Sequence, residues 1–472
     1  MKLNIITYKD LVGSNQYIFY SILLGIFASI TLDFLLGLIL ALLLIFLIIG
    51  YCRKFLISII LVSLLSFASD INVSIRLIIQ ISSFAGLLYL FLDKYGLKSS
   101  SYPNIPDLVK GFLILFYFSM LVSITFSNHP LDGMFLLLRV SIFFLIAYIF
   151  YSLLNSYDDI DLIIKGLVFT CVVLSFGIYY QFITEGFNLF DFVNNSQIRI
   201  AGFNSNINAS AGVFAAVLPV ITSLLFYKKK RIYKAALGLI ILFIVVALLL
   251  TNSRAAILSI IISTIILLFQ LRRKLFLISI SVILSIILIV YFLEPLSEFL
   301  ILLLRLESGM SFREYYWKLS TNIINDNLIF GIGPGNYRYV MFDYYPVMMD
   351  SGVSWFMTEL QEMLPINNNS HNFYLMFFSD MGILGFVTSL SLPLVFFIIS
   401  FRTIGQLSVS DGKIYYIILG IIAAGIGLFI RGLFEAIGLI FYGYITADLP
   451  FWILFGILLF IYFNTKRIKH FS

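Results

Sequence analysis

Long apolar runs recur along almost the whole chain, and they limit its possible folds more than any other feature. A helix needs about 20 apolar residues to cross a bilayer, and in lipid each backbone polar group must be paired within the protein. The chain is 61% hydrophobic and only 11% charged. The sequence therefore predicts an all-α fold, a polytopic transmembrane helical bundle of about 12–14 spans.

The spacing of the runs predicts both the spans and the division of the chain. We expect spans near residues 17–31, 33–50, 55–68, 73–92, 108–128, 134–154, 162–184, 204–227, 235–250, 255–271, 275–293, 372–400, 413–431 and 450–464. The predicted regions are N-terminal transmembrane helices (1–190), transmembrane helices with outer arginine motifs (191–293), an external segment (294–371), and C-terminal transmembrane helices with a tail (372–472).

Basic loops indicate the orientation of the bundle. Lysine and arginine cluster at 228–231, 272–274 and 466–469, and cytoplasmic loops carry an excess of these residues. Counting spans from these loops predicts that both termini lie inside and that residues 294–371 lie outside. The formal charge of +6 reflects these loops, so it gives no support to nucleic-acid binding.

The predicted outer side carries arginine in place of lysine. Its basic residues are Arg76, Arg139, Arg199, Arg254, Arg305, Arg313, Arg338 and Arg431, with the single lysine Lys318. Orientation alone requires only positive charge, whereas a planar guanidinium can grip a phosphate through two hydrogen bonds. The composition of this side therefore indicates an anion-binding surface.

The external segment is predicted to contain one amphipathic helix. Ser311 and Glu314 have the spacing of a capping box, which starts a helix that should extend to about Asn325. One face of this helix would carry Phe312, Tyr316, Leu319 and Ile323. We expect this face to lie on the membrane surface.

Two patterns that resemble phosphate or metal sites have simpler explanations. The string Gly331–Asn336 follows no predicted strand and precedes no suitably placed lysine, so a plain turn is favoured over a phosphate cradle. Asp159 and Asp161 match the carboxylate pair that holds a metal in nucleotide-sugar transferases. They fall in a short cytoplasmic loop, where solvated acids are expected.

Three residues beside apolar helices are the main candidates for chemistry. Arg199 precedes such a helix among small and amide residues, which suit an anion, although an interfacial arginine could also reach lipid headgroups. Arg254 lies in a tight outer turn that needs no charge, which favours function. His371 closes the external segment and could be catalytic or structural. Asp380 would fall on the opposite side of the helix that follows His371, so it is not an expected partner.

The other polar residues of the outer side are open to more than one interpretation. Arg313 and Arg338 could complete an anion site, or they could simply be solvated. Arg139 lies inside a span and needs a partner, so a structural ion pair is as plausible as function. Arg431 and Glu435 are four residues apart, which predicts a local pair on one helix.

The outer motifs, taken in order, resemble the O-antigen ligase and polymerase superfamily. They are Arg199–Asn206, Leu250–Arg254, Gly331–Asn336, His371–Leu375 and Gly382–Gly385, with a long external loop between the later helices. The resemblance covers about residues 195–400, whereas the first half of the chain agrees only in hydropathy.

This resemblance implies a membrane glycosyltransferase in the bacterial cytoplasmic membrane. Members take a glycan from undecaprenyl pyrophosphate outside that membrane and pass it to an acceptor hydroxyl. Carried over, Arg199 and Arg254 would hold the pyrophosphate, with Arg313 and Arg338 as additional candidates, and His371 would act at the acceptor. Pyrophosphate is a good leaving group, so we expect no metal and no cofactor, and attack from the opposite face would invert the anomeric carbon.

Two alternatives remain beside a ligase that transfers the glycan to a lipid A-core or similar acceptor. A polymerase would use the same donor and add the chain to another lipid-linked repeat. A polysaccharide flippase would also need outer arginines and a bundle that faces lipid. The asymmetric external segment and the position of His371 favour a transferase over a flippase.

Overall fold

The computed structural model describes residues 73–96, 102–187, 198–204, 206–227, 230–292, 313–344 and 369–468. Nearly all of this part of the chain is helix, and no strand occurs in it. The predicted all-α helical bundle is therefore confirmed. The predicted spans at 17–31, 33–50 and 55–68 lie outside the described residues.

Nine helices in the described part of the chain are long and apolar enough to cross a membrane. They are α5 (Asp107–Thr125), α6 (Pro130–Leu153), α7 (Tyr157–Thr184), α9 (Ile207–Tyr227), α10 (Arg231–Thr251), α11 (Arg254–Leu271), α18 (Phe373–Ile404), α19 (Lys413–Arg431) and α20 (Ile445–Ile468). The remaining helices are α4 (Val73–Tyr95), α12 (Arg273–Phe292), α14 (Arg313–Asp326) and the short α15 (Tyr337–Val340), with a 3₁₀ turn at Val409–Asp411.

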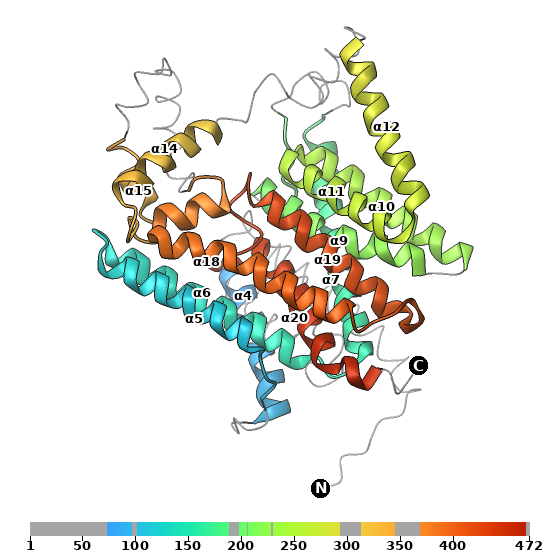
Figure 1. The fold of residues 1–472 in the computed structure, drawn as a ribbon, viewed down its shortest axis with the longest axis horizontal. Helices are drawn as coiled ribbons and strands as arrows, with labels where there is room; N and C mark the ends of the chain where they lie inside the picture. The colour runs from blue at the N-terminus through green and yellow to red at the C-terminus, as the bar shows by residue number, and fades with distance from the viewer. Residues whose placement is uncertain are drawn as a thin grey trace.

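Helix α9 is at the centre of the bundle and packs against α7, α10, α11, α19 and α20 (Figure 1). Small residues allow such close packing in membranes. A Cβ atom on Gly427 of α19, for example, would lie 2.6 Å from the Ser259 carbonyl oxygen of α11. In the same contact, the Ser263 hydroxyl donates to the Ala423 carbonyl at 2.9 Å.

The loops between the spans separate into two ends of the bundle. One end, here called the site end, carries residues 126–129, 198–206, 252–253 and 432–444 together with α14 and α15. The opposite end carries the basic loops, and Lys413 there pairs with Asp161 of α7. Asp161 also pairs with Lys165 at 2.8 Å, and Asp159 completes a capping box at the start of α7. Both acids therefore belong to α7 and have structural partners, so the expectation that they are solvated residues of a short loop is wrong.

Helix α18 is broken at Gly382, where the backbone adopts φ 61° and ψ −152°. The break exposes backbone groups that the segment 328–333 pairs. Ile332 and Gly333 donate N–H groups to the carbonyls of Ser379 and Asp380, and Ile383 donates to the Leu328 carbonyl, all at 2.9–3.0 Å. The string Gly331–Asn336 is thus a turn whose first residues bind α18, as the sequence predicted.

Helices α14 and α15 form a small external unit with its own apolar core. Tyr316, Leu319 and Ile323 of α14 pack with Ile332, Tyr337 and Met341. The helix is confirmed over Arg313–Asp326, whereas the predicted capping residue Ser311 and the face residue Phe312 lie outside the described residues. The expectation that this face lies on the membrane surface is wrong. The face is instead covered by the turn and by α15, so these side chains are removed from solvent within the protein. Figure 1 shows the unit beyond the ends of α5 and α18.

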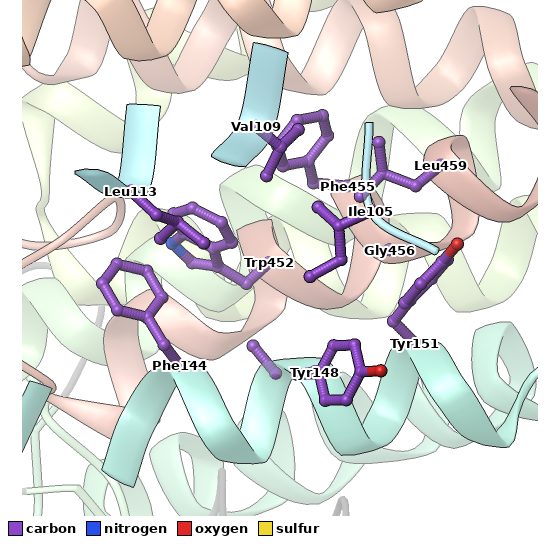
Figure 2. A pocket seen from close by; sticks show the side chains of 11 residues that line it. Ile105, Val109, Leu113, Phe144, Tyr148, Tyr151, Trp452, Phe455, Gly456 and Leu459 are labelled. Carbon is purple, nitrogen blue, oxygen red and sulfur yellow. The ribbon is translucent and has the colours of Figure 1, made fainter. Parts of the chain in front are cut away.

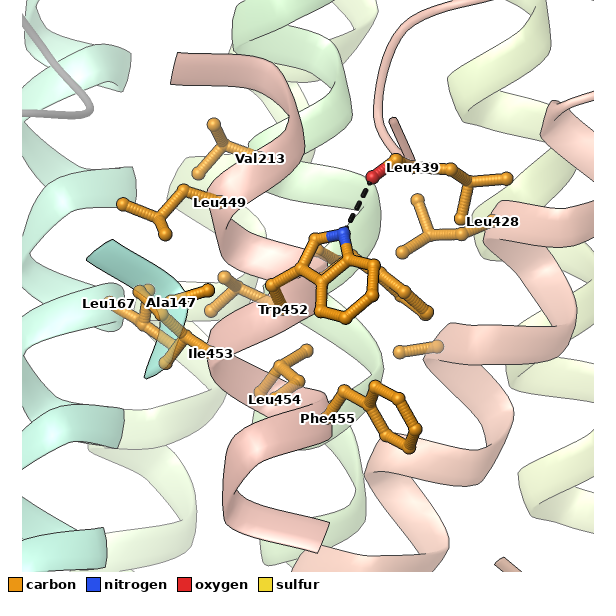
Figure 3. Close-up of a cluster of buried hydrophobic side chains, with 14 of the residues drawn as sticks. Ala147, Leu167, Val213, Leu428, Leu439, Leu449, Trp452, Ile453, Leu454 and Phe455 are labelled. Carbon is orange, nitrogen blue, oxygen red and sulfur yellow. Dashed lines mark hydrogen bonds between the residues drawn. The ribbon is translucent and has the colours of Figure 1, made fainter. Parts of the chain in front are cut away.

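Most of the segment 432–444 is buried although it is not helical, with Leu433 as its exposed residue. Side chains pair many of its backbone polar groups. The Trp452 indole N–H, two turns into α20, donates to the Leu439 carbonyl at 2.8 Å (Figure 3). The Asp448 carboxylate accepts from the Gly438 and Phe441 N–H groups, and the Asn372 amide donates to the Leu433 carbonyl. This segment, here called the re-entrant segment, therefore folds back into the bundle from the site end.

A small pocket lies between α5, α6 and α20 (Figure 2). Its walls are apolar apart from Tyr148 and Tyr151, whose hydroxyls donate to the carbonyls of Pro103 and Asn104. These residues are at the basic end of the bundle. The pocket therefore provides no group suited to glycan chemistry.

Replacing Gly331 with alanine should loosen the external unit. A Cβ atom there would lie 2.5 Å from the Asp380 carbonyl carbon and the Met381 nitrogen, at a φ of +69°. We expect Gly331→Ala to lose about 2 kcal/mol or more of stability, measured as a lower melting temperature in detergent and faster proteolysis within 313–344. Gly238→Ala is the matched control, because nothing lies within 4 Å of its Cβ position. Equal melting temperatures for both variants would contradict the proposed packing.

Candidate functional site

A buried carboxylate, Glu435, lies at the centre of the site end. Its Oε1 atom is 3.6 Å from His371 Nδ1, and its Oε2 atom is 3.4 Å from Arg313 Nη2. The three residues, here called the Glu435 cluster, come from the re-entrant segment, the start of α18 and the start of α14. A buried charge normally has such partners, because an isolated one would be costly.

The surroundings of Glu435 keep it ionised. Burial alone raises the pKa of this carboxyl, but the neighbouring His371, Arg313 and Arg431 outweigh that effect and lower the pKa to about 2. The carboxylate can therefore hold a positive or hydrogen-bonding partner over the whole physiological pH range.

The backbone around His371 is fixed by local hydrogen bonds. Its φ is +50°, a value that few non-glycine residues adopt and that often occurs at functional positions. The Asn369 side chain accepts from the His371 N–H at 2.8 Å. Asn372 caps α18 by accepting from Tyr374 and Leu375.

The imidazole of His371 is also held in place. Its ring packs edge-on against Tyr316 of α14, with the ring centroids 5.1 Å apart. Nδ1 is 3.6 Å from Glu435 Oε1, beyond hydrogen-bonding distance, and it has no hydrogen-bond partner among the described residues. A slightly closer approach of the two groups would let the carboxylate orient the histidine and leave its second nitrogen for proton transfer.

Arg431 and Glu435 do not form the local helical pair that their spacing suggested. Helix α19 ends at Arg431, so Glu435 lies beyond the helix. The Gly432 carbonyl accepts a hydrogen bond from the Phe373 N–H at 2.8 Å. Arg431 is almost fully buried. Its guanidinium donates to the carbonyls of Ile437 and Asn208, at 2.6 and 2.7 Å, and so ties the re-entrant segment to α9.

A second cluster centres on Asn208, near the start of α9. The Asn208 side-chain oxygen accepts from Arg199 Nη2 and from the Ser253 hydroxyl, both at 3.0 Å. The Ile200 N–H also donates to the Leu250 carbonyl. We call Asn208, Arg199 and Ser253 the Asn208 cluster. It joins the two arginine motifs that are far apart in the sequence.

Arg254 directly follows Ser253 and is the first residue of α11. It is partly buried and therefore lies at the site end beside the Asn208 cluster. Since Arg431 contacts Asn208 and also lowers the pKa of Glu435, the two clusters are parts of one polar region. The structure thus brings together the segments that carry Arg199, Arg254, Arg313 and His371.

Several buried donors in this region are not used by the described part of the chain. Among the described residues, no hydrogen-bond partner is found for Arg313 Nε, Arg431 Nε or the Asn204 side-chain nitrogen. Buried polar groups are nearly always paired. Donors of this kind suit an anionic or hydroxyl-bearing ligand.

Arg338 lies in a different place from the other candidate arginines. It pairs with Asp132 of α6 at 3.0 Å, and the Tyr339 hydroxyl donates to the same carboxylate at 2.8 Å. The guanidinium also lies 4.6 Å from the Tyr339 ring centre. The charge of Arg338 is thus balanced by one carboxylate.

Arg139 is a support for the re-entrant segment. Its Nε donates to the Gly443 carbonyl at 3.3 Å, and a Cβ atom on Gly443 would lie 2.8 Å from the Arg139 carbonyl oxygen. The sequence offered an ion pair or a function for Arg139; the contact that the structure shows is instead a hydrogen bond to a backbone carbonyl.

Sequence reasoning missed Glu435 and Asn208. The signal for Glu435 was present: Gly432, Gly438 and Gly443 interrupt the apolar run between α19 and α20 and argue against a continuous helix. Asn208 gave no comparable signal, because an amide near a helix start is also an ordinary capping residue. Asp380, as expected, is not a partner of His371; it accepts from the Tyr442 hydroxyl at 2.8 Å.

The site end combines several arginines with His371. Arg313 and Arg431 are the arginines that act on the buried Glu435 carboxylate, and Asp448 is a second buried carboxylate near Arg431. Among the described residues, no group of three or more His, Cys, Asp or Glu side chains could hold a metal ion. The arrangement can bind a polyanion and move a proton beside it.

Comparison with known proteins agrees with this chemistry. Residues 239–390 match a protein-family model described as O-Antigen ligase, whereas no curated protein matches the chain. The matched region includes Arg254, α14 and His371 but excludes Arg199 and Glu435. This match supports placing the chain, a multi-pass membrane protein, in the O-antigen ligase superfamily.

Proposed function

We propose that this protein is an O-antigen ligase-like glycosyltransferase of the bacterial cytoplasmic membrane. It moves a glycan from undecaprenyl pyrophosphate to an acceptor hydroxyl, on lipid A-core or a similar molecule, at the outer leaflet. The observation that carries this proposal is the Glu435 cluster beside the Asn208 cluster. An oriented histidine there adjoins an excess of arginine, at the end of the bundle opposite the basic loops.

The arginines have the role of binding and stabilising the pyrophosphate. Arg199, Arg254 and Arg313 belong to the region where cations outnumber carboxylates. Guanidinium groups there would stabilise the negative charge that develops as the pyrophosphate leaves. Arg338 is the fourth candidate, but Asp132 already balances its charge, so its proposed role has less support.

His371 is the proposed general base. The acceptor oxygen attacks the anomeric carbon and loses its proton to Nε2, while the bond from that carbon to the pyrophosphate oxygen breaks. Undecaprenyl pyrophosphate leaves with the bonding electrons, and the anomeric configuration is inverted. As the imidazolium forms, Glu435 would draw closer to its Nδ1–H and stabilise it, which leaves Nε2 for the acceptor proton. No step requires a metal or a cofactor.

Removing the side chain of His371 or of Arg254 should abolish glycan transfer while the protein stays folded. We expect His371→Ala and Arg254→Ala each to lower the transfer rate by about 100-fold or more, measured with purified enzyme, lipid-linked donor and acceptor. Arg402→Ala is the control, because this exposed arginine is at the other end of α18. Full transfer by both site variants would rule out the proposed roles.

Neutralising Glu435 should damage activity and remove a pH-dependent part of the stability. We expect Glu435→Gln to lower transfer by about 10-fold or more, while Glu314→Gln, on the exposed face of α14, has little effect. The pKa of Glu435 is lowered to about 2, below the usual value of about 4.3. Its charge therefore stabilises the fold above about pH 4.3, and this contribution is lost as the pH falls toward 2.

The measurement for the second part is the melting temperature against pH. The gap between wild type and Glu435→Gln should be full at neutral pH and should shrink below about pH 4. A gap that stays constant down to the lowest measurable pH would contradict the assigned charge state.

Deleting the gene in its host would separate a ligase from a polymerase. A ligase predicts long glycans that accumulate on undecaprenyl pyrophosphate, because transfer to the final acceptor fails. A polymerase predicts surface lipid that carries a single repeat. Gel profiles of lipid-linked and surface glycans would distinguish the two outcomes, and an unchanged profile would contradict both.

A further inference from the structure

Three consecutive apolar side chains are exposed at the tip of the external unit. Leu328, Ile329 and Phe330 expose 50%, 61% and 37% of their surface, directly after α14. Solvated loops seldom present three such residues in a row, and an exposed apolar patch usually marks a contact surface. Their position relative to the membrane can be derived from two neighbouring helices.

The first indication of depth comes from α18. Beyond the break at Gly382, the helix continues from Ile383 to Ile404, about 22 residues or about 33 Å. This length matches the hydrocarbon core of a bilayer, about 30 Å, so Ile383 lies at its outer boundary. The Ile383 N–H donates to the Leu328 carbonyl at 2.9 Å, which fixes Leu328 at the same level.

The second indication comes from α5. This span ends at Thr125, and the next residue, Phe126, is 60% exposed. The Phe126 ring stacks on Phe330, with the ring centroids 3.8 Å apart and the planes 14° from parallel. Phe330 is therefore level with the end of a membrane span. Both helices place the three residues at the same boundary.

The exposed residues also continue a surface that must face lipid. Helices α5 and α18 pack side by side. Their outward faces expose Ile114, Phe118 and Leu121 on α5 and Ile383, Val387, Leu390 and Leu394 on α18. Residues 328–330 extend this surface at its outer end, and they are also exposed apolar side chains.

We infer that Leu328, Ile329 and Phe330 insert into the outer boundary of the bilayer hydrocarbon and anchor the external unit there. The occupant of this surface is lipid acyl chain, because the surface is continuous with the lipid-facing sides of two spans and lies at their depth. Apolar side chains at this level typically sink about 5–10 Å into the boundary between headgroups and acyl chains. The amphipathic face of α14 is not available for this role, since α15 and the turn cover it.

The anchor has a consequence for α14. Asp326 ends this helix two residues before Leu328, and Arg313 begins it. Holding the C-terminal end of α14 at the membrane boundary limits how far Arg313, at the other end of this 14-residue helix, can move away from the membrane. The anchor itself does not depend on the proposed transferase activity.

Tryptophan fluorescence tests the anchor directly. Ile329→Trp would be compared with Thr321→Trp, an exposed position on α14 of the same unit, and with the parent protein, whose three tryptophans all variants share. The full-length protein would be reconstituted in phosphatidylcholine vesicles with or without bromine on the upper acyl chain. We expect the emission added at 329 to be blue-shifted and quenched about threefold or more by brominated lipid. The emission added at 321 should be neither blue-shifted nor quenched by brominated lipid.

The outcomes that would overturn the inference are distinct. Water-like emission at 329 would mean that the side chain stays outside the bilayer. Blue-shifted emission that brominated lipid does not quench would mean that protein, such as a second copy, covers the surface. If Ile329→Trp fails to fold, Leu328→Trp tests the same boundary. Glycan transfer does not enter these readouts, so they stand apart from the proposed function.

Discussion

The buried segment 432–444 sets the main constraint on the rest of the structure, because its backbone is not helical and yet lies inside an apolar bundle. Every N–H and C=O at such a depth needs a partner. Side chains supply many of them: Arg431, Asn372, Asp448, Trp452 and Arg139. The same hydrogen bonds fix the backbone around Glu435. The groups that pair the backbone of this segment therefore also position the carboxylate beside His371. Stability and site geometry therefore depend on one set of hydrogen bonds.

The distribution of charge distinguishes the site from the ion pairs elsewhere in the protein. Asp161 pairs with two lysines at the basic end, and Asp132 balances Arg338 on the external unit. In contrast, Glu435 is the one carboxylate within ion-pair distance of Arg313 among the described residues, and Arg431 is bound only to carbonyls there. A polyanion would complete this charge distribution. The proposed pyrophosphate-linked donor has that property.

The fold could be predicted from sequence because lipid imposes simple rules, whereas the site depends on contacts that hydropathy does not report. Apolar run length located the spans closely; α19 begins and ends as expected. Motifs and the outer arginine bias pointed to Arg199, Arg254, Arg313 and His371, and the structure brings their segments together. Glu435 was missed because helical spacing from Arg431 offered a sufficient explanation. Asn208 was missed because its role requires Ser253, which is 45 residues away.

The pairing of residues 328–333 with the broken part of α18 resembles the register of two strands, although neither segment is a strand. Three backbone hydrogen bonds specify which residue lies opposite which. One residue added within 328–333 would shift this register by about 3.5 Å. The three bonds therefore hold the external unit, and with it the helix that begins at Arg313, in one fixed position along α18.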